Sequence, residues 1–148
     1  LCITHFKYTH WYCHNLNFYL KVSDIRNKAV ELQGINGHFP VKLNYAIAKN
    51  LKVLIAECET AAAQNQKVLD GKATKDKNGE YVFKDNEIVF PDEKTKKEAL
   101  NELNDISNLE IEVEIMTVPM SVLEMCDTEK YDTPTSKEMA ALEFMIGE

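Results

Sequence analysis

A stretch of about 25 residues without Gly or Pro constrains the fold of this chain more than any other feature. Between Asn44 and Leu69, apolar side chains recur every three or four residues, the period of one face of an α-helix. That face comprises Ile47, Leu51, Leu54, Cys58, Ala61 and Val68, and Ile55 and Ala62 widen it. A helix of this length spans roughly 40 Å, so we expect a second helix to lie along it.

Two further helices are predicted to flank the long one. Ser23 is placed to cap a first helix, which should end at Gly34 because Gly tolerates a left-handed conformation. Pro91-Asp92 opens a helix over about 92–107, which should pack antiparallel against the long helix, and Asp70-Gly71 should end the long helix. Residues 39–43 should be extended, because Pro40 disfavours helix in the residue before it.

The clearest predicted strand is 109–115, where apolar residues alternate strictly with Glu. Its partner should be the stretch 41–43 or a small hairpin within 81–90. A helical turn is expected at 121–126, and a capping box at Thr135 should start the last helix. The predicted class is therefore α+β: an antiparallel helical hairpin with one long helix, a small two- or three-stranded sheet and a C-terminal helix.

The first 20 residues differ in composition from the rest of the chain. They contain no Asp or Glu, yet they hold three of the four His, the single Trp and two of the four Cys. The chain begins with Leu1, and its first Met is Met116. We therefore interpret residues 1–20 as a leader-like segment, non-native or disordered, read in frame before a start codon at Leu20. Residues 21–148 would then form a single domain.

Composition restricts the class of protein. A 45% hydrophobic and 28% charged chain of 148 residues is typical of one globular domain. No apolar run reaches the roughly 20 residues that span a bilayer, and polar residues interrupt the N-terminal region where a secretory signal would need an apolar stretch. Beyond residue 20, two isolated cysteines favour reduced thiols in a cytosol.

Charge is concentrated at the C-terminal end. Residues 1–100 carry 15 Lys or Arg against 12 Asp or Glu, whereas residues 101–148 carry 2 Lys against 12 Asp or Glu. The negative electric field of this end repels nucleic acid and anionic lipid and attracts basic surfaces. Two interpretations follow: a dedicated basic partner, or acidic groups that are solvated or paired with basic helices of the same chain.

Metal sites are not favoured by the residue pattern. The zinc-ligand types in the N-terminal segment (Cys2, His5, His10, Cys13 and His14) have no matching pair downstream. The stretch 74–85 resembles a calcium loop, but it lacks an acid at its first position and the bidentate Glu at its twelfth. We therefore expect no metal and no other cofactor.

Catalytic motifs are also missing. Cys58 lies on the apolar stripe and should be buried and inert, and Asp127 should raise the pKa of Cys126. There is no G-x-S-x-G, H-E-x-x-H or phosphate-cradling Gly loop. Acid–base catalysis would have to rest on His38 or a tuned carboxylate, so we expect that the protein is not an enzyme.

The acidic C-terminal third offers a candidate partner-binding surface. One group of carboxylates follows the predicted strand and another follows Cys126 in a predicted loop: Glu110, Glu112, Glu114, Asp127, Glu129 and Asp132. Five methionines also lie in this third, as core filling or as an adaptable docking surface: Met116, Met120, Met125, Met139 and Met145.

Two stretches carry a resemblance to a known family. The sequences FPVKLNYAIAKNLKVLIAECE (residues 39–59) and MAALEFMIGE (residues 139–148) resemble an uncharacterised family of short phage and prophage proteins of low-GC Gram-positive bacteria. The likeness covers residues 21–148, and its motifs are structural rather than catalytic. It implies a phage accessory protein that acts in the bacterial host cytoplasm or in the assembling virion.

These observations lead to one main expectation and two alternatives. The chain should be a non-enzymatic protein that binds a basic protein partner, as an assembly factor or as a modulator of a host protein, with no direct contact to nucleic acid or membrane; a homo-oligomer stays open. The first alternative is an acidic nucleic-acid mimic that inhibits a host DNA- or RNA-binding enzyme. The second is a small hydrolase, whose sign would be His38 and an acid in one pocket.

Overall fold

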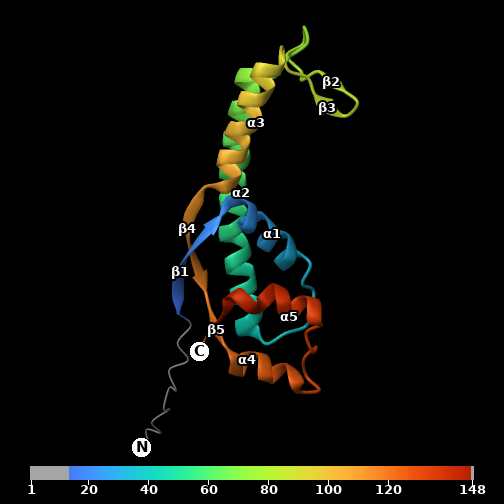
Figure 1. Cartoon of the computed structure of the whole chain (residues 1–148). Helices are drawn as coiled ribbons and strands as arrows, with labels where there is room; N and C mark the ends of the chain where they lie inside the picture. The colour runs from blue at the N-terminus through green and yellow to red at the C-terminus, as the bar shows by residue number, and fades with distance from the viewer. Residues whose placement is uncertain (1–13, 148) are drawn as a thin grey trace, which may run out of the picture.

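The computed structural model describes residues 14–147, which form an α+β fold (Figure 1). Its helices are α1 (Val22–Gln33), α2 (Val41–Lys72), α3 (Glu93–Asn108), α4 (Met120–Glu124) and α5 (Ser136–Leu142). Its strands are β1 (Asn15–Lys21), β2 (Phe83–Lys84), β3 (Glu87–Ile88), β4 (Glu110–Met116), β5 (Val118–Pro119) and β6 (Ile146–Gly147). The 3₁₀ turns η1 (Met125–Asp127) and η2 (Glu143–Met145) follow α4 and α5.

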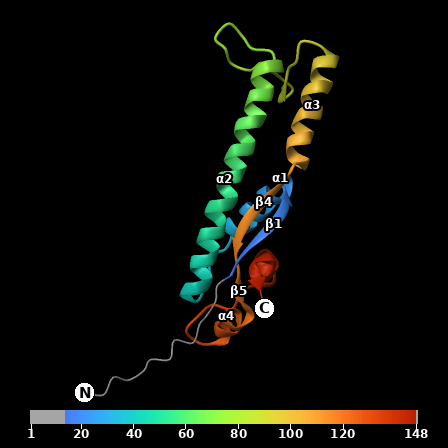
Figure 2. The ribbon, with the colours of Figure 1, turned by 90° about the vertical axis from the view of Figure 1, so that its left-hand side faces the viewer.

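The long helix α2 connects two parts of the molecule. Its first half lies in a base with α1, β1, β4, α4 and α5, and its second half pairs with α3 to form an arm (Figures 1 and 2). The antiparallel pair β2–β3 lies at the end of this arm. The predicted helical hairpin is therefore confirmed, as are the long helix, the strand near 109–115 and the C-terminal helix with its capping box at Thr135.

The hydrophobic core lies in the base, between α2 and the elements around it. Leu43, Ala46 and Leu54 of α2 are fully buried, because they lie on the side of the helix that faces the rest of the base. They form one cluster with residues of α1, β4, α4, α5 and η2: Ile25, Leu32, Val113, Ile115, Val122, Leu142 and Met145. In the arm, the small side chains Ala61 and Ala99 are buried, so the two helices can approach closely there.

Asn50 is a fully buried polar residue in the middle of this core. Its Nδ2 donates to the Met116 carbonyl at 2.9 Å, and its Oδ1 accepts from the Met116 N–H at 2.8 Å. The side chain therefore pairs with the strand edge as a neighbouring strand would, on the edge that β1 does not cover. Since an unpaired buried backbone group is costly, this contact ties α2 to the end of β4.

The partner of β4 is β1, and this corrects two expectations. The strands pair antiparallel from Asn15 opposite Met116 to Lys21 opposite Glu110, so neither the stretch 41–43 nor the hairpin supplies the partner. The folded part also reaches back to Asn15, within the segment interpreted as leader-like. Phe18 and Leu20 pack against the core from the inner face of β1, and this burial explains why the strand is ordered. Residues 1–13 lie outside the described residues.

Three local expectations are wrong at element ends. Helix α1 begins at Val22 without a side-chain cap from Ser23, because β1 runs directly into it and the Val22 N–H donates to the Leu109 carbonyl. Residues 41–43 are helical, since Pro40 restricts itself and its predecessor but suits a helix start. Helix α2 continues past Gly71 to Lys72, which lies 3.3 Å from both Glu98 and Glu102 of α3.

We expect the variant Asn50→Leu to lower the free energy of unfolding by about 2–4 kcal/mol, because it leaves both backbone groups of Met116 buried without partners. Urea denaturation followed by circular dichroism measures the loss. The exposed Asn27 of α1 gives the matched control, and Asn27→Leu should change stability by less than about 0.5 kcal/mol. Equal effects of the two substitutions would contradict the role assigned to Asn50.

A chain that starts at Lys21 should be less stable than one that starts at His14, by roughly 3 kcal/mol or more. It loses the buried surface of Phe18 and Leu20 and uncovers one edge of β4. Thermal and urea unfolding of the two truncated chains make the comparison, with the full chain as reference. Equal stability of the two truncated chains would show that β1 contributes nothing.

Candidate protein-interaction surface

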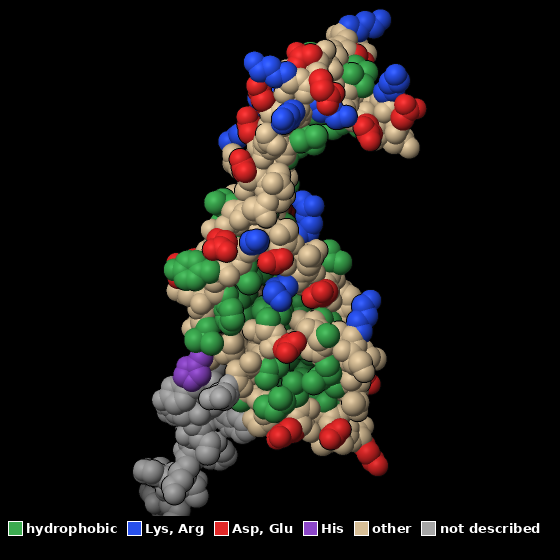
Figure 3. Space-filling view, viewed as in Figure 1, with side chains coloured by type: hydrophobic (Ala, Val, Ile, Leu, Met, Phe, Trp, Pro, Cys, Tyr) green, Lys and Arg blue, Asp and Glu red, His purple; other side chains and the backbone are tan. Residues whose placement is uncertain are grey.

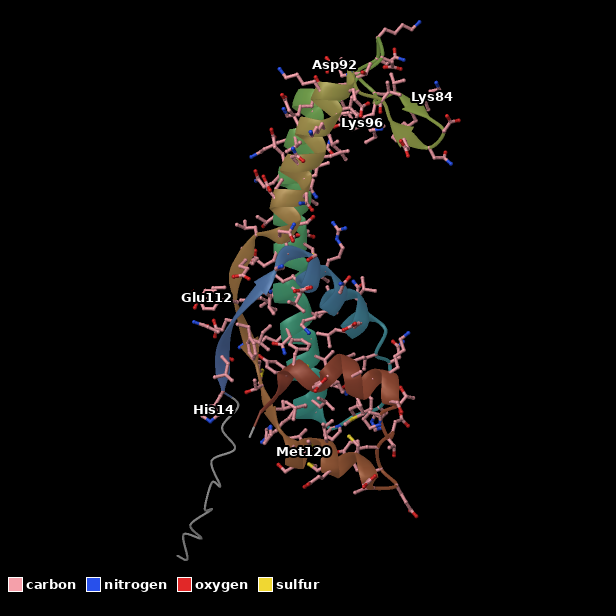
Figure 4. All side chains as sticks on the ribbon, in the orientation of Figure 1. His14, Lys84, Asp92, Lys96, Glu112 and Met120 are labelled. Atoms are coloured by element: carbon pink, nitrogen blue, oxygen red, sulfur yellow. The ribbon has the colours of Figure 1, made fainter. Side chains whose placement is uncertain are left out.

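The first group of carboxylates lies on the outward face of β4. Strand alternation buries Val113 and Ile115 and leaves Glu110, Glu112 and Glu114 exposed. Figure 4 shows Glu112 at the side of the base, pointing away from α2. Alternate residues of a strand are about 7 Å apart, so the three carboxylates form a short row.

The neighbours of this row on β1 are mostly polar and uncharged. Lys21, Tyr19 and Asn17 stand opposite Glu110, Glu112 and Glu114. Asn17 Nδ2 donates to Glu112 Oε1 at 2.8 Å, across the diagonal of the sheet, and the Tyr19 side chain is 71% exposed. The face therefore combines a row of acceptors with an exposed aromatic ring.

The second group of carboxylates follows α4. Asp127 and Glu129 are exposed, at η1 and just after it. Asp132 differs from them, because its carboxylate accepts the His38 N–H at 2.5 Å and its own N–H donates to the His38 carbonyl at 2.9 Å. Asp132 therefore anchors the segment after α4 to the loop between α1 and α2.

A small apolar groove of about 320 Å³ lies beside this second group. Pro40, Val41 and Lys42 at the start of α2 form one wall, and Val122, Met125 and Tyr131 form the other. The Tyr131 ring lies 5.6 Å from the His38 ring, centroid to centroid, and Lys130 Nζ lies 5.3 Å from the Tyr131 ring centroid. Acidic side chains and exposed apolar surface thus adjoin at this end of the base.

The six predicted residues do not form one continuous surface. The strand row and the segment after α4 lie on opposite sides of the base in Figure 1. A single small partner would therefore contact one group or the other, and each group must be tested separately.

The salt bridges between described residues lie in the arm. Within residues 14–147, the salt bridges join Lys72 to Glu98 and Glu102, Lys75 to Asp70, Lys94 to Glu98, and Lys96 to Glu87. Figure 3 shows basic and acidic side chains interspersed over this arm. None of these pairs includes any of the six carboxylates, so their charge is not locally neutralised by such a pair.

Both cysteines of the described chain have thiol pKa values that are raised. Burial is the main cause for Cys126, and Asp127 adds to it, as expected from their adjacency. Burial also raises the pKa of Cys58, although this side chain is half-buried rather than buried as predicted. A raised thiol pKa reduces the fraction of reactive thiolate.

The contact between His38 and Asp132 does not form an acid–base pair. The backbone of His38, rather than its imidazole, bonds to Asp132, and the imidazole lies against Tyr131. Among residues 14–147, no group of three His, Cys, Asp or Glu side chains is arranged to hold a metal ion.

The methionines divide between the core and the surface. Met145 is fully buried and contacts Asn50, whereas Met120, Met125 and Met139 are exposed by 52, 42 and 39%. Core filling therefore explains Met145 but not these three. Met125 lines the groove beside the second acidic group, and Figure 4 places Met120 at the lower end of the base.

No protein-family model, curated protein or solved structure matches this chain. In the described part of the chain, no helix has the length and apolar character needed to cross a membrane.

Two substitutions separate the contribution of the Asp132 charge from that of its hydrogen bond to the His38 N–H. Asp132→Ala removes both charge and acceptor and should lower the free energy of unfolding by about 1–2 kcal/mol. Asp132→Asn keeps an acceptor for the His38 N–H and should cost less than half as much. Thermal unfolding and amide exchange at His38 measure both effects, and equal losses for the two variants would contradict this account.

Proposed function

We propose that this chain is a non-enzymatic phage accessory protein that acts by contact with a protein partner bearing a basic surface. The observation that carries the proposal is the set of six carboxylates that no lysine of the described scaffold pairs with. An exposed carboxylate without a salt bridge to a described residue can pair with a cation from a partner. The phage origin rests on the sequence resemblance, which also implies the host cytoplasm or the assembling virion as its location.

The groove supports protein contact rather than purely electrostatic attraction. Protein interfaces combine an apolar centre with a polar rim, and the Met125–Val41 groove with Asp127 and Glu129 nearby offers both. Flexible methionine side chains adapt to different partners. An assembly factor or a modulator of a host protein would use such a surface.

A second candidate function is favoured by the row on β4. Carboxylates spaced regularly along a ridge can imitate a phosphate backbone, and Glu110, Glu112 and Glu114 form such a ridge. An acidic mimic would inhibit a host DNA- or RNA-binding enzyme. Competition between the protein and DNA for a host nuclease tests this function, and the Gln variants of the row should lose the competition.

The main proposal predicts salt-dependent binding through one of the two groups of carboxylates. We expect either Glu110→Gln/Glu112→Gln/Glu114→Gln or Asp127→Asn/Glu129→Gln to reduce partner capture from infected cells at least about tenfold, since close interfacial charge pairs contribute about 1.5 kcal/mol or more. High salt should weaken capture by the unaltered protein in the same way. Quantitative mass spectrometry of the captured proteins is the measurement.

A matched control removes two charges from the arm. Glu80→Gln/Asp105→Asn alters exposed carboxylates outside both groups and should leave capture unchanged. Asp132 is kept in all variants because of its structural bonds. The proposal fails when neither variant changes which proteins are captured, or when the arm control reduces capture equally.

A further inference from the structure

The side of α2 that faces away from the core combines small apolar side chains with two charged ones. At 3.6 residues per turn, Ala48, Ile55 and Ala56 lie on the side away from Asn50 and Leu54, whereas Leu51 lies at the border of this side and packs against the core. Ala48, Ile55 and Ala56 line a shallow hollow of about 510 Å³ together with Leu51, Lys52 and Glu59, and all six residues belong to α2. In Figure 2, α2 lies along one side of the molecule, and this outer side faces away from α3 and the β1–β4 sheet.

The two charges on this face are spaced for a reversed copy of the same helix. Lys52 and Glu59 are seven residues apart, which is close to two turns, so they lie on one stripe. When two α2 helices pack antiparallel about a point between Ile55 and Ala56, Lys52 of each copy comes level with Glu59 of the other. The same register sets Ala48 opposite Ala63. Neither Lys52 nor Glu59 takes part in the salt bridges of residues 14–147.

We propose that a second copy of this chain docks on the outer face of α2 to form an antiparallel, two-fold symmetric dimer. The charge order selects this occupant, because a surface complementary to Lys52 and Glu59 must present an acid and a base in reverse order at the same spacing. The outer face of α2 presents them itself. A two-fold interface uses the same patch on both subunits, and one such patch suffices here.

The remaining residues of the face suit close helix packing. The alanines allow the two helix axes to approach, and Ile55 of each copy fills the centre next to Ala56 of the other. Antiparallel helices also oppose their dipoles favourably. The face is separate from the six carboxylates, so self-association does not depend on the proposed basic partner.

Charge reversal tests the dimer and its register together. We expect the unaltered full chain to show concentration-dependent dimerisation by sedimentation equilibrium, with a reducing agent present because the chain has four cysteines. Lys52→Glu alone, or Glu59→Lys alone, places like charges opposite each other twice per dimer and should raise the dimer Kd at least about tenfold. The double variant Lys52→Glu/Glu59→Lys restores opposite charges and should return the Kd to within about threefold of the original.

Two further variants complete the test. Lys97→Glu changes an exposed charge on α3 and should leave the Kd unchanged, whereas Ile55→Asp should abolish the dimer while circular dichroism confirms that the helices are retained. A monomer at all concentrations overturns the proposal. A dimer Kd that neither single reversal changes also overturns it. So does a Kd that the double variant does not return toward the original value.

Discussion

The contact between Asn50 and Met116 holds the base of this protein together. A fully buried amide side chain replaces a strand neighbour at the end of β4, with both of its bonds at 2.8–2.9 Å. β1 covers the other edge of β4, and the His14 carbonyl accepts from both the N–H and the hydroxyl of Thr117 at 2.9 Å. The end of the sheet is therefore paired on both sides, although it contains two strands. Helix α2 takes its position relative to the sheet from this contact.

Beyond Cys58, α2 leaves the core and continues into an arm with different energetics. The arm buries small side chains and carries exposed ion pairs, each of which contributes little to stability in water. Near its end, the Asp70 carboxylate accepts from Lys75 and Tyr81, which lowers the pKa of Asp70 and raises the pKa of Tyr81 to about 12. These bonds hold the start of the connection to α3 against the last turns of α2.

The sequence was sufficient to predict the elements that depend on local pattern, and it failed where distant segments decide the structure. Period and capping residues predicted α2, α3 and α5, and alternation predicted β4. β1 lies in a segment whose composition differs from that of the rest of the chain, and only the alternation of Leu16, Phe18 and Leu20 with polar residues indicates a strand there. The exposure of the strand glutamates followed from alternation, whereas the bonds between Asp132 and His38 join residues 94 positions apart, beyond what spacing can indicate.

The acidic groups and the outer face of α2 have a joint consequence for binding. Three carboxylates about 7 Å apart in water repel each other by roughly 0.6 kcal/mol per neighbouring pair, a cost that the fold tolerates without a salt bridge from a described lysine to this row. That repulsion falls when a cation binds. The row therefore attracts a basic partner more strongly at low salt than at high salt. A two-fold dimer through α2 would present each of the two groups of carboxylates twice. A partner with repeated basic sites, such as an assembling shell, would then bind with an apparent affinity above that of either site alone, and a monomeric partner would not.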